Sequence, residues 1–424
     1  MNMSFNPFNE KPQKVDSLYM DWQKIYPKAY DKYDVDPYTK VRCILMNGTE
    51  YEANWFSHQF FRHCNNNDIR RELAAIRRTE QQQQKRISNL KPVNETILET
   101  TISYEQLAVD LTAILAQREK NAYVKRAMEF ALLEDFDHLY RYANLLDMEM
   151  GVHAERLVGG YTEITPGRPT VSEHRHPYDD VKRYTDFKTA DPITKLNVSI
   201  ITAAEQQTMN YYMNQTGFYT SDLGRELYAE IGMIEEQHVS LYGSLMDVNT
   251  TWLECWLNHE YTECYLYYSC FKDETDPYIK TVWEQHLMME IAHLHKVAEI
   301  LKNVEGKEWQ QVIPNGAFPE LIAFGPQKEY IRNVLKNTVT NTATMEDYVD
   351  INSLDDKAIF FEYQRQVNSD ISRVASHVVI DRYIDDNGID YRFEESKNPR
   401  KELENRRVDN VELGRCKQKV SVKA

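Results

Sequence analysis

The stretch IEEQHVSLY, residues 234–242, places Glu235 and His238 three positions apart. Residues three apart lie on one face of an α-helix, so this pair offers a carboxylate and an imidazole side by side. Glu205 stands thirty positions before Glu235, which is about the length that a helical hairpin needs to return to its own level. The sequence therefore predicts a two-helix hairpin that carries Glu205, Glu235 and His238 at one height.

The same pattern occurs in two other parts of the chain, each time with a glutamate thirty positions before an acid-x-x-His motif. One such motif is common by chance, but three copies with matched spacing are far harder to obtain that way. The hairpins supply nine candidate metal ligands: Glu105, Asp135 and His138 in the first, Glu205, Glu235 and His238 in the second, and Glu260, Glu290 and His293 in the third.

These motif residues interrupt stripes of apolar and aromatic side chains. In the helix expected over 222–246, Glu235 and His238 share their face with Tyr228, Ile231 and Tyr242. An unpaired buried carboxylate is costly, so a charge in such a stripe needs compensation. Two metal ions compensate several such charges at once, and this favours a metal site over a set of solvated acids.

Residues 93–305 resemble the ferritin-like di-iron carboxylate superfamily, which includes rubrerythrins, manganese catalases, ferritins and di-iron oxygenases. There, a Glu from each of two helices and a Glu-x-x-His from each of two others hold two metal ions. The resemblance implies two iron ions, with manganese as the alternative, and an oxidoreductase of the peroxidase, catalase or oxygenase type. Its expected partners are dioxygen or peroxide, a small-molecule substrate and an electron donor of unknown identity.

Two other functions stay open from the sequence. One is a non-enzymatic protein that binds or stores iron, which the length of the chain disfavours because storage shells use short single-bundle chains. The other is a structural bundle with a vestigial metal site.

Chain topology indicates which hairpins face each other. The link from Asp247 to Thr250 is too short to reverse a hairpin, whereas residues 151–190 can cross the bundle. This favours the first and second hairpins as the metal pair, although residue match alone favours the second and third. The third hairpin could replace one of them, add ligands or complete a site across a homodimer.

Two details near the motifs bear on the ligand set. Asp135 stands where the motif usually has Glu, so its shorter side chain is expected to bind one metal ion, and the adjacent Glu134 falls off the core stripe. The crossover contains Glu173-His174-Arg175-His176, which looks like a binding loop but lacks metal spacing.

Tyrosines follow the motifs at a fixed distance. Tyr142, Tyr212 and Tyr242 each stand seven residues after a motif acid. They are candidate catalytic residues that relay electrons or hydrogen-bond a ligand. The alternative is that they are core tyrosines whose hydroxyl groups are satisfied.

The expected fold is all-α: a ferritin-like bundle of three helical hairpins with a small N-terminal β-hairpin and extra flanking helices. The β-hairpin is expected over 41–53, because Asn47-Gly48 stands between two strand-like runs. The sequence divides into an arm with this hairpin and polar helices, the bundle with its dinuclear site, and a C-terminal helical extension with a charged tail, over residues 1–92, 93–305 and 306–424.

Composition narrows the class of protein. The net charge of −16 argues against nucleic acids and membrane surfaces as partners, since both attract basic patches. No segment approaches the roughly 18 consecutive apolar residues of a membrane span. Six scattered cysteines without a Cys-x-x-Cys pair, and no apolar N-terminal stretch, indicate free thiols in a reducing compartment. We therefore expect a cytoplasmic protein. A homodimer is a separate expectation, since a second chain could complete a site at the third hairpin.

Overall fold

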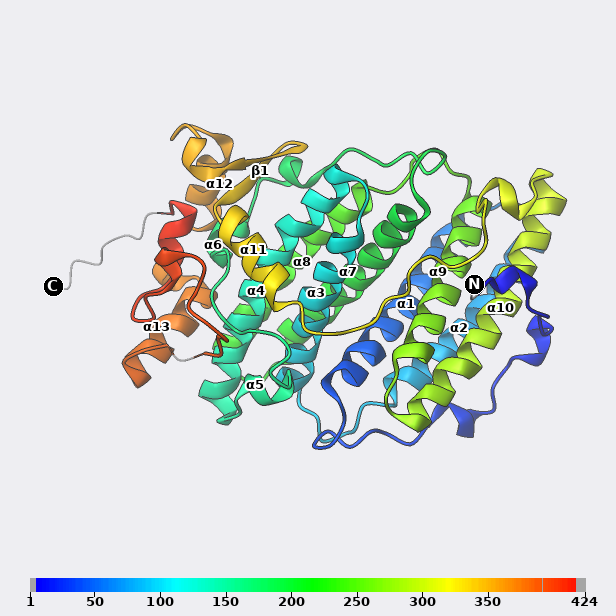
Figure 1. The fold of residues 1–424 in the computed structure, drawn as a ribbon, viewed down its shortest axis with the longest axis horizontal. Helices are drawn as coiled ribbons and strands as arrows, with labels where there is room; N and C mark the ends of the chain where they lie inside the picture. Colours follow the sequence, from blue (N-terminus) through cyan, green and yellow to red (C-terminus); the bar gives the residue numbers. More distant parts are fainter. Residues whose placement is uncertain (1–4, 391, 417–424) are drawn as a thin grey trace. The chain divides into compact units, whose positions relative to one another are not determined.

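The computed structural model describes residues 5–390 and 392–416, and this part of the chain is mostly α-helical, as expected (Figure 1). It forms two compact units, each built from segments that are not contiguous in sequence. The first unit comprises residues up to Glu95, Thr185–Gln207 and Met246–Phe324, and the second comprises Thr96–Tyr184, Thr208–Leu245 and the chain from Gly325. The sequence had suggested three consecutive ranges instead.

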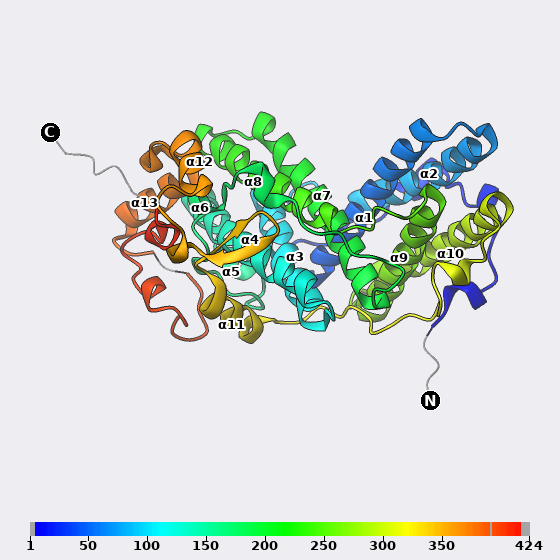
Figure 2. The ribbon, with the colours of Figure 1, turned by 90° about the horizontal axis from the view of Figure 1, so that it is seen from above.

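The first unit contains two long helical hairpins. One consists of α1 (Pro37–His63) and α2 (Asn67–Ser88), and the other of α9 (Trp252–Asp273) and α10 (Pro277–Glu305). Figure 2 shows the two helices of each hairpin side by side. Helix α1 packs on α9 and α2 packs on α10, so the four helices bury a common interior.

The expected β-hairpin over 41–53 is wrong, because these residues form the first half of α1. Asp36 caps this helix by accepting from the Tyr38 amide, and Pro37 occupies its first turn. Gly48 makes no turn: a Cβ atom there would lie 2.9 Å from Cδ of Gln207. Asn47 donates to Oε1 of Gln207 at 2.6 Å, so tertiary packing decides the conformation of the Asn-Gly pair.

The second unit also contains two hairpins. One consists of α3 (Ile97–Arg118) and α4 (Ala122–Met150), and the other of the end of α7 (Pro192–Phe218) and α8 (Asp222–Ser244). Helix α4 packs on α8, and the ring of Tyr104 on α3 stacks on Tyr211 of α7 with 4.3 Å between centroids. The first and second hairpins therefore pack on each other, and whether they form the metal pair stays a prediction.

Shorter elements cover the second unit. The crossover from α4 to α7 holds the one-turn helices α5 (Ala154–Leu157) and α6 (Thr170–Glu173). The described C-terminal residues form α-helices and an antiparallel sheet, namely α11 (Lys328–Thr338), β1 (Asn341–Thr344), β2 (Asp347–Asp350), α12 (Ile359–Val367) and α13 (Ala375–Asn387). The flanking helices were expected, but the sheet was not, since the only strands expected were those of the β-hairpin over 41–53.

Two expectations from composition can be compared with the structure. The six cysteines form no disulfide. Among the described residues, none of the helices combines the length and apolar character needed to cross a bilayer.

A buried ionic network attaches the C-terminal segment to α4. The guanidinium of Arg141 lies 2.9 Å from Oδ2 of Asp137 and 3.1 Å from Oδ1 of Asp409, and Asp409 also contacts His377. Burial alone would raise the pKa of Asp409, but Arg141 and His377 hold it below its ordinary value.

We expect Asp409→Asn to lower the free energy of unfolding by about 3 kcal/mol at pH 7, because it removes one of the two carboxylates that contact the buried Arg141 and the one that contacts His377. A lowered folded-state pKa stabilises the protein above the ordinary carboxyl pKa, and this stabilisation is lost as the pH falls through the folded value. Urea unfolding at several pH values should show the variant and the wild type converging below about pH 4. A difference that stays constant with pH would contradict this account.

Candidate metal centre

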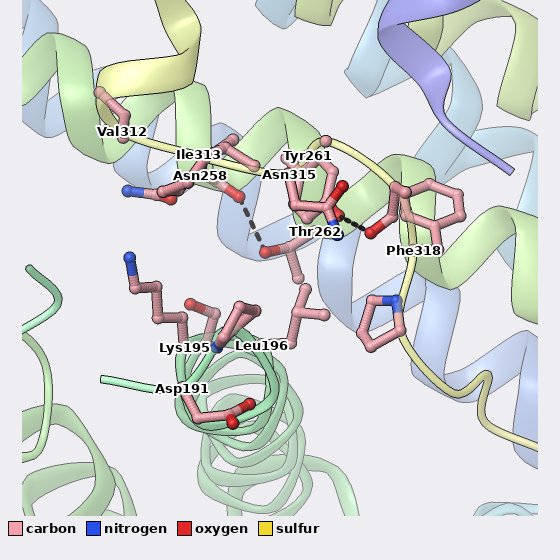
Figure 3. Close-up of a pocket in the computed structure, with 16 residues that line it drawn as sticks. Asp191, Lys195, Leu196, Asn258, Tyr261, Thr262, Val312, Ile313, Asn315 and Phe318 are labelled. Carbon is pink, nitrogen blue, oxygen red and sulfur yellow. Dashed lines mark hydrogen bonds between the residues drawn. The ribbon is translucent and has the colours of Figure 1, made fainter. Parts of the chain in front are cut away.

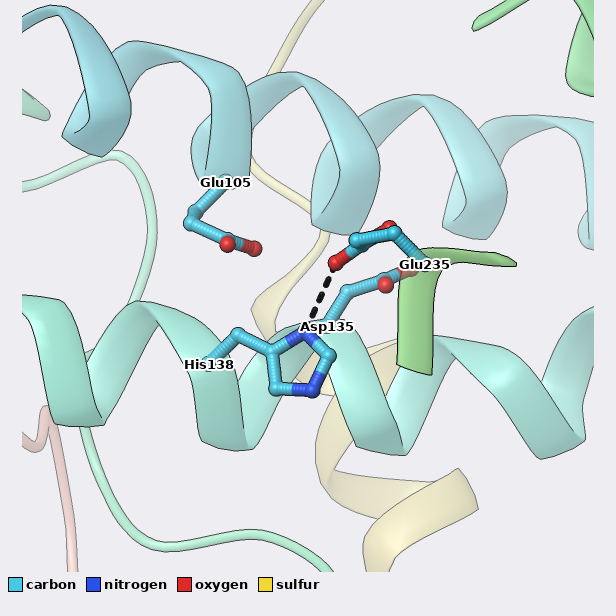
Figure 4. A group of neighbouring side chains, drawn as sticks. All are labelled: Glu105, Asp135, His138 and Glu235. Carbon is cyan, nitrogen blue, oxygen red and sulfur yellow. Dashed lines mark hydrogen bonds and ion pairs between the residues drawn. The ribbon is translucent and has the colours of Figure 1, made fainter. Parts of the chain in front are cut away.

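Helices α3, α4 and α8 bring four predicted ligands together in the second unit (Figure 4). One ligand atom from each of Glu105, Asp135, His138 and Glu235 lies within 4.8 Å of the others, and all four side chains are fully buried. Figure 4 shows the carboxylates of Glu105 and Glu235 converging on the His138 ring. We call these four residues together with His238 the two-histidine centre.

Glu235 lies between two imidazoles. Its Oε1 lies 2.9 Å from Nδ1 of His138, and its Oε2 lies 3.5 Å from Nδ1 of His238. Nδ1 of His238 also lies 3.2 Å from Oδ1 of Asp135. Both rings therefore turn the same nitrogen towards the shared carboxylates, which is the arrangement that two neighbouring cations would need.

A second carboxylate contacts the far nitrogen of each ring. Nε2 of His138 lies 2.8 Å from Oε2 of Glu173, and Nε2 of His238 lies 2.8 Å from Oε2 of Glu134. Metal-binding histidines commonly donate their other ring N–H to a carboxylate, which fixes the ring and the tautomer. The expectation that Glu134 lies off the core stripe is wrong, since its side chain is fully buried.

Two arginines from the crossover hold Glu134. Nη1 of Arg168 lies 2.6 Å from its Oε1, and Nη1 of Arg175 lies 2.5 Å from the same atom. Burial would raise the pKa of Glu134, but Arg175 and Arg168 lower it below its ordinary value. An ionised Glu134 favours a proton on Nε2 of His238 and leaves Nδ1 as a ligand atom.

Several oxygens in the two-histidine centre have no hydrogen-bond donor. Oε1 of Glu105 accepts from the Tyr212 hydroxyl at 2.6 Å, but its Oε2 has no hydrogen-bond partner, and neither has Oδ2 of Asp135. Burial, with the charges of Glu235 and Asp135, raises the pKa of Glu105 well above its ordinary value, although His138 opposes this. Buried acceptors without donors are costly, and a cation would satisfy them.

The other predicted ligands come from α7, α9 and α10. Glu205 is buried on α7, in the portion of this helix that belongs to the first unit. Glu260, Glu290 and His293 gather in the first unit, where Nδ1 of His293 lies 3.0 Å from Oε2 of Glu290 and 3.7 Å from Oε2 of Glu260.

The three candidate tyrosines differ in their contacts. Tyr212 donates to Glu105, as described above. The ring of Tyr142 packs on those of Tyr212 and Tyr228, with centroids 5.3 and 5.0 Å away. The ring of Tyr242 lies 6.5 Å from that of His238. Tyr212 thus has a direct hydrogen bond to a candidate ligand, and a catalytic role for the three stays a prediction.

The structure also reveals a fourth hairpin that sequence reasoning missed. Helices α1 and α2 carry Glu50 and Glu80 thirty positions apart, with Gln83 where the other hairpins have His. Glu50 precedes Glu105 by 55 positions, just as Glu205 precedes Glu260. This spacing was available in the sequence, but Gln83 and the misread Asn47-Gly48 pair concealed it.

The first unit has a pocket away from these acids (Figure 3). Its volume is about 180 Å³, and Lys195, Leu196, Thr262 and Phe318 are among the residues that line it. None of its lining residues is a candidate metal ligand.

Replacing Glu173 with Gln should weaken metal binding in the two-histidine centre about 10- to 100-fold, because His138 would lose the carboxylate on its far nitrogen. Burial raises the pKa of the Glu173 carboxyl to about 8, although the neighbouring His138 lowers that pKa. Competitive titration with Fe²⁺ or Mn²⁺ measures the effect. Glu236→Gln on α8 is the matched control, and equal affinities in the two variants would contradict a role for Glu173.

Comparisons with protein-family models, with curated proteins and with solved structures give no match for this chain. The residues and geometry of the centre are therefore the basis for a functional assignment.

Proposed function

We propose that this protein is a dinuclear metal carboxylate protein of the ferritin-like type, and that it acts as an oxidoreductase on dioxygen or peroxide. The observation that supports this most is the placement of Glu235 between two imidazoles, each with a carboxylate on its far nitrogen. The proposed ligands are Glu105, Asp135, His138, Glu205, Glu235 and His238, of which Glu205 is assigned by its spacing from Glu235.

The donor set fits iron or manganese. Four carboxylates balance the charge of two divalent cations, and two imidazoles without thiolates suit these metals better than the sulfur-rich sites that zinc often takes. When bound, such a metal pair supplies two electrons to dioxygen or peroxide. Iron is the first expectation and manganese the alternative.

The residues of the chain prepare the site for this chemistry. Glu173 and Glu134 hold the two imidazole rings, and the Tyr212 hydroxyl holds one oxygen of Glu105. The buried rings of Tyr142 and Tyr228 pack beside Tyr212 and keep water from the carboxylates. Preorganised ligands of this kind need not rearrange when the metal enters.

Metal loading followed by turnover measurements tests the proposal. Crystals of the full chain loaded with Fe²⁺ or Mn²⁺ should show anomalous scattering from two ions beside Glu105, Asp135 and Glu235. The loaded protein should consume dioxygen or peroxide over many turnovers. Metal without turnover would indicate a protein that binds or stores iron, and no metal at these residues would indicate a vestigial site.

A further inference from the structure

A second group of buried ligand atoms lies in the first unit, between the α1–α2 and α9–α10 hairpins. Ligand atoms of Glu80, Glu260 and His293 lie within 4.8 Å of one another, and so do those of Glu260, Glu263 and Glu290. The two sets share Glu260, and each of the five side chains is at most 1% exposed. Overlapping sets with a common carboxylate are what two adjacent cations require.

Three carboxylates of this group, those of Glu50, Glu260 and Glu290, each accept a side-chain hydrogen bond at Oε1. Nε1 of Trp256 donates to Oε1 of Glu260 at 2.6 Å, and Nε2 of Gln83 donates to Oε1 of Glu290 at 2.5 Å. The Tyr267 hydroxyl donates to Oε1 of Glu50, much as Tyr212 donates to Glu105 in the other unit.

The opposite oxygens lack donors. Oε2 of Glu50, Oε2 of Glu80 and Oε2 of Glu260 have no hydrogen-bond partner, although all three side chains are buried. Oε2 of Glu260 points to the group, since it lies 3.7 Å from Nδ1 of His293. Glu50 and Glu260 are thus each held through one oxygen and have an unsatisfied second oxygen for an ion.

The charges in the group are unbalanced. Five buried carboxyl groups, those of Glu50, Glu80, Glu260, Glu263 and Glu290, meet few basic side chains. Nδ1 of His293 contacts Oε2 of Glu290. Nδ1 of His259 lies 3.0 Å from Oε2 of Glu52, and its Nε2 lies 3.5 Å from Oε1 of Glu263. Two imidazoles cannot neutralise this excess of acid, and burying uncompensated carboxylates is costly.

We propose that the first unit holds a second divalent-cation centre, the one-histidine centre, built from Glu50, Glu80, Glu260, Glu263, Glu290 and His293. Gln83 takes the position that His138, His238 and His293 take in the other hairpins, so this centre has one imidazole ligand and more carboxylates. Oxygen-rich sites suit harder cations, so it should prefer Mn²⁺ more strongly than the two-histidine centre does. It would bind metal whether or not the other centre performs redox chemistry.

The first experiment separates the two centres in the full chain. In a His138→Ala/His238→Ala variant, titration with Mn²⁺ followed by electron paramagnetic resonance should still show bound ions. Adding Glu260→Gln should then weaken this binding at least about tenfold, because Glu260 belongs to both ligand sets. Glu284→Gln, which changes an exposed acid on α10, is the matched control.

Two results would overturn the one-histidine centre: no Mn²⁺ bound by the double variant, or Mn²⁺ bound equally well with and without Glu260→Gln. A failure of the proposed oxidoreductase would look different. In that case the wild type would show no turnover with dioxygen or peroxide, or no metal beside Glu105, Asp135 and Glu235, while Mn²⁺ binding in the first unit would still depend on Glu260.

The second experiment adds a ligand to the one-histidine centre and leaves the proposed carboxylate ligands of that centre in place. Gln83→His places an imidazole at the position occupied by His in the other three hairpins. In the double-variant background it should shift the affinity ratio about tenfold from Mn²⁺ towards Co²⁺, since nitrogen donors favour the later metals. Visible absorption of bound Co²⁺ reports the new ligand, and an unchanged ratio with no spectral change would contradict the proposed position of the ions.

Discussion

Replacing Glu235 with alanine should empty the two-histidine centre and abolish dioxygen- or peroxide-dependent turnover. Glu235 contacts both His138 and His238, so its loss affects both metal positions at once. It also leaves two imidazoles without the carboxylate that they share. Metal analysis of the purified variant and oxygen consumption measure the two effects.

Glu236→Ala is the control for this variant, because it removes the neighbouring acid of α8, whose carboxylate accepts from Ser240. The control should keep its metal and its activity. Two ions still present beside Asp135 and His138 in the Glu235→Ala protein would count decisively against the assigned ligands. Crystals of both proteins, examined at the metal absorption edges, provide that comparison.

Replacing Arg175 with leucine should lower the free energy of unfolding by about 3–5 kcal/mol. Its guanidinium is buried and contacts Glu134 at 2.5 Å and Asp180 at 3.0 Å, so the variant leaves two buried carboxylates with too few cations. Arg168 still contacts Glu134, which keeps the loss within this range. Urea unfolding of the metal-free protein measures the change without a contribution from bound ions.

Arg183→Leu is the matched control, because Arg183 belongs to the same crossover but is exposed and lies 3.7 Å from its acidic partner Asp347. An exposed pair at this distance contributes little, so this variant should unfold like the wild type. Equal stability of the Arg175 and Arg183 variants would show that the arginine network around Glu134 does not stabilise the fold.

Local periodicity was sufficient to predict the long helices and the motif positions on them. Asp135 and His138, three residues apart in an apolar stripe, lie on one buried face of α4 as expected. The helix expected over 222–246 begins where α8 (Asp222–Ser244) begins and ends two residues after it. These features depend on contacts within one helix or one hairpin, and sequence spacing reports such contacts directly.

Features that depend on distant segments were missed. Glu134 looks like a surface residue in the helical pattern, and its burial follows from Arg168 and Arg175, which lie more than thirty positions away. Glu173 becomes a partner of His138 because the crossover folds back on α4. The Asn47-Gly48 pair has the local signature of a turn, but contacts with Gln207 place it within a helix. Local propensity yields to tertiary packing in such cases.

The hairpins that form each unit are nested in sequence: α3–α4 and α7–α8 lie between α1–α2 and α9–α10. During synthesis, the four long helices of the second unit are complete once Ser244 has been made. Helices α1 and α2 must wait until α10 ends at Glu305, and closing that longer loop slows folding more than it lowers stability. We therefore expect the inner helices to fold first, with the residues of the proposed two-histidine centre assembled before α1 and α2 meet α9 and α10.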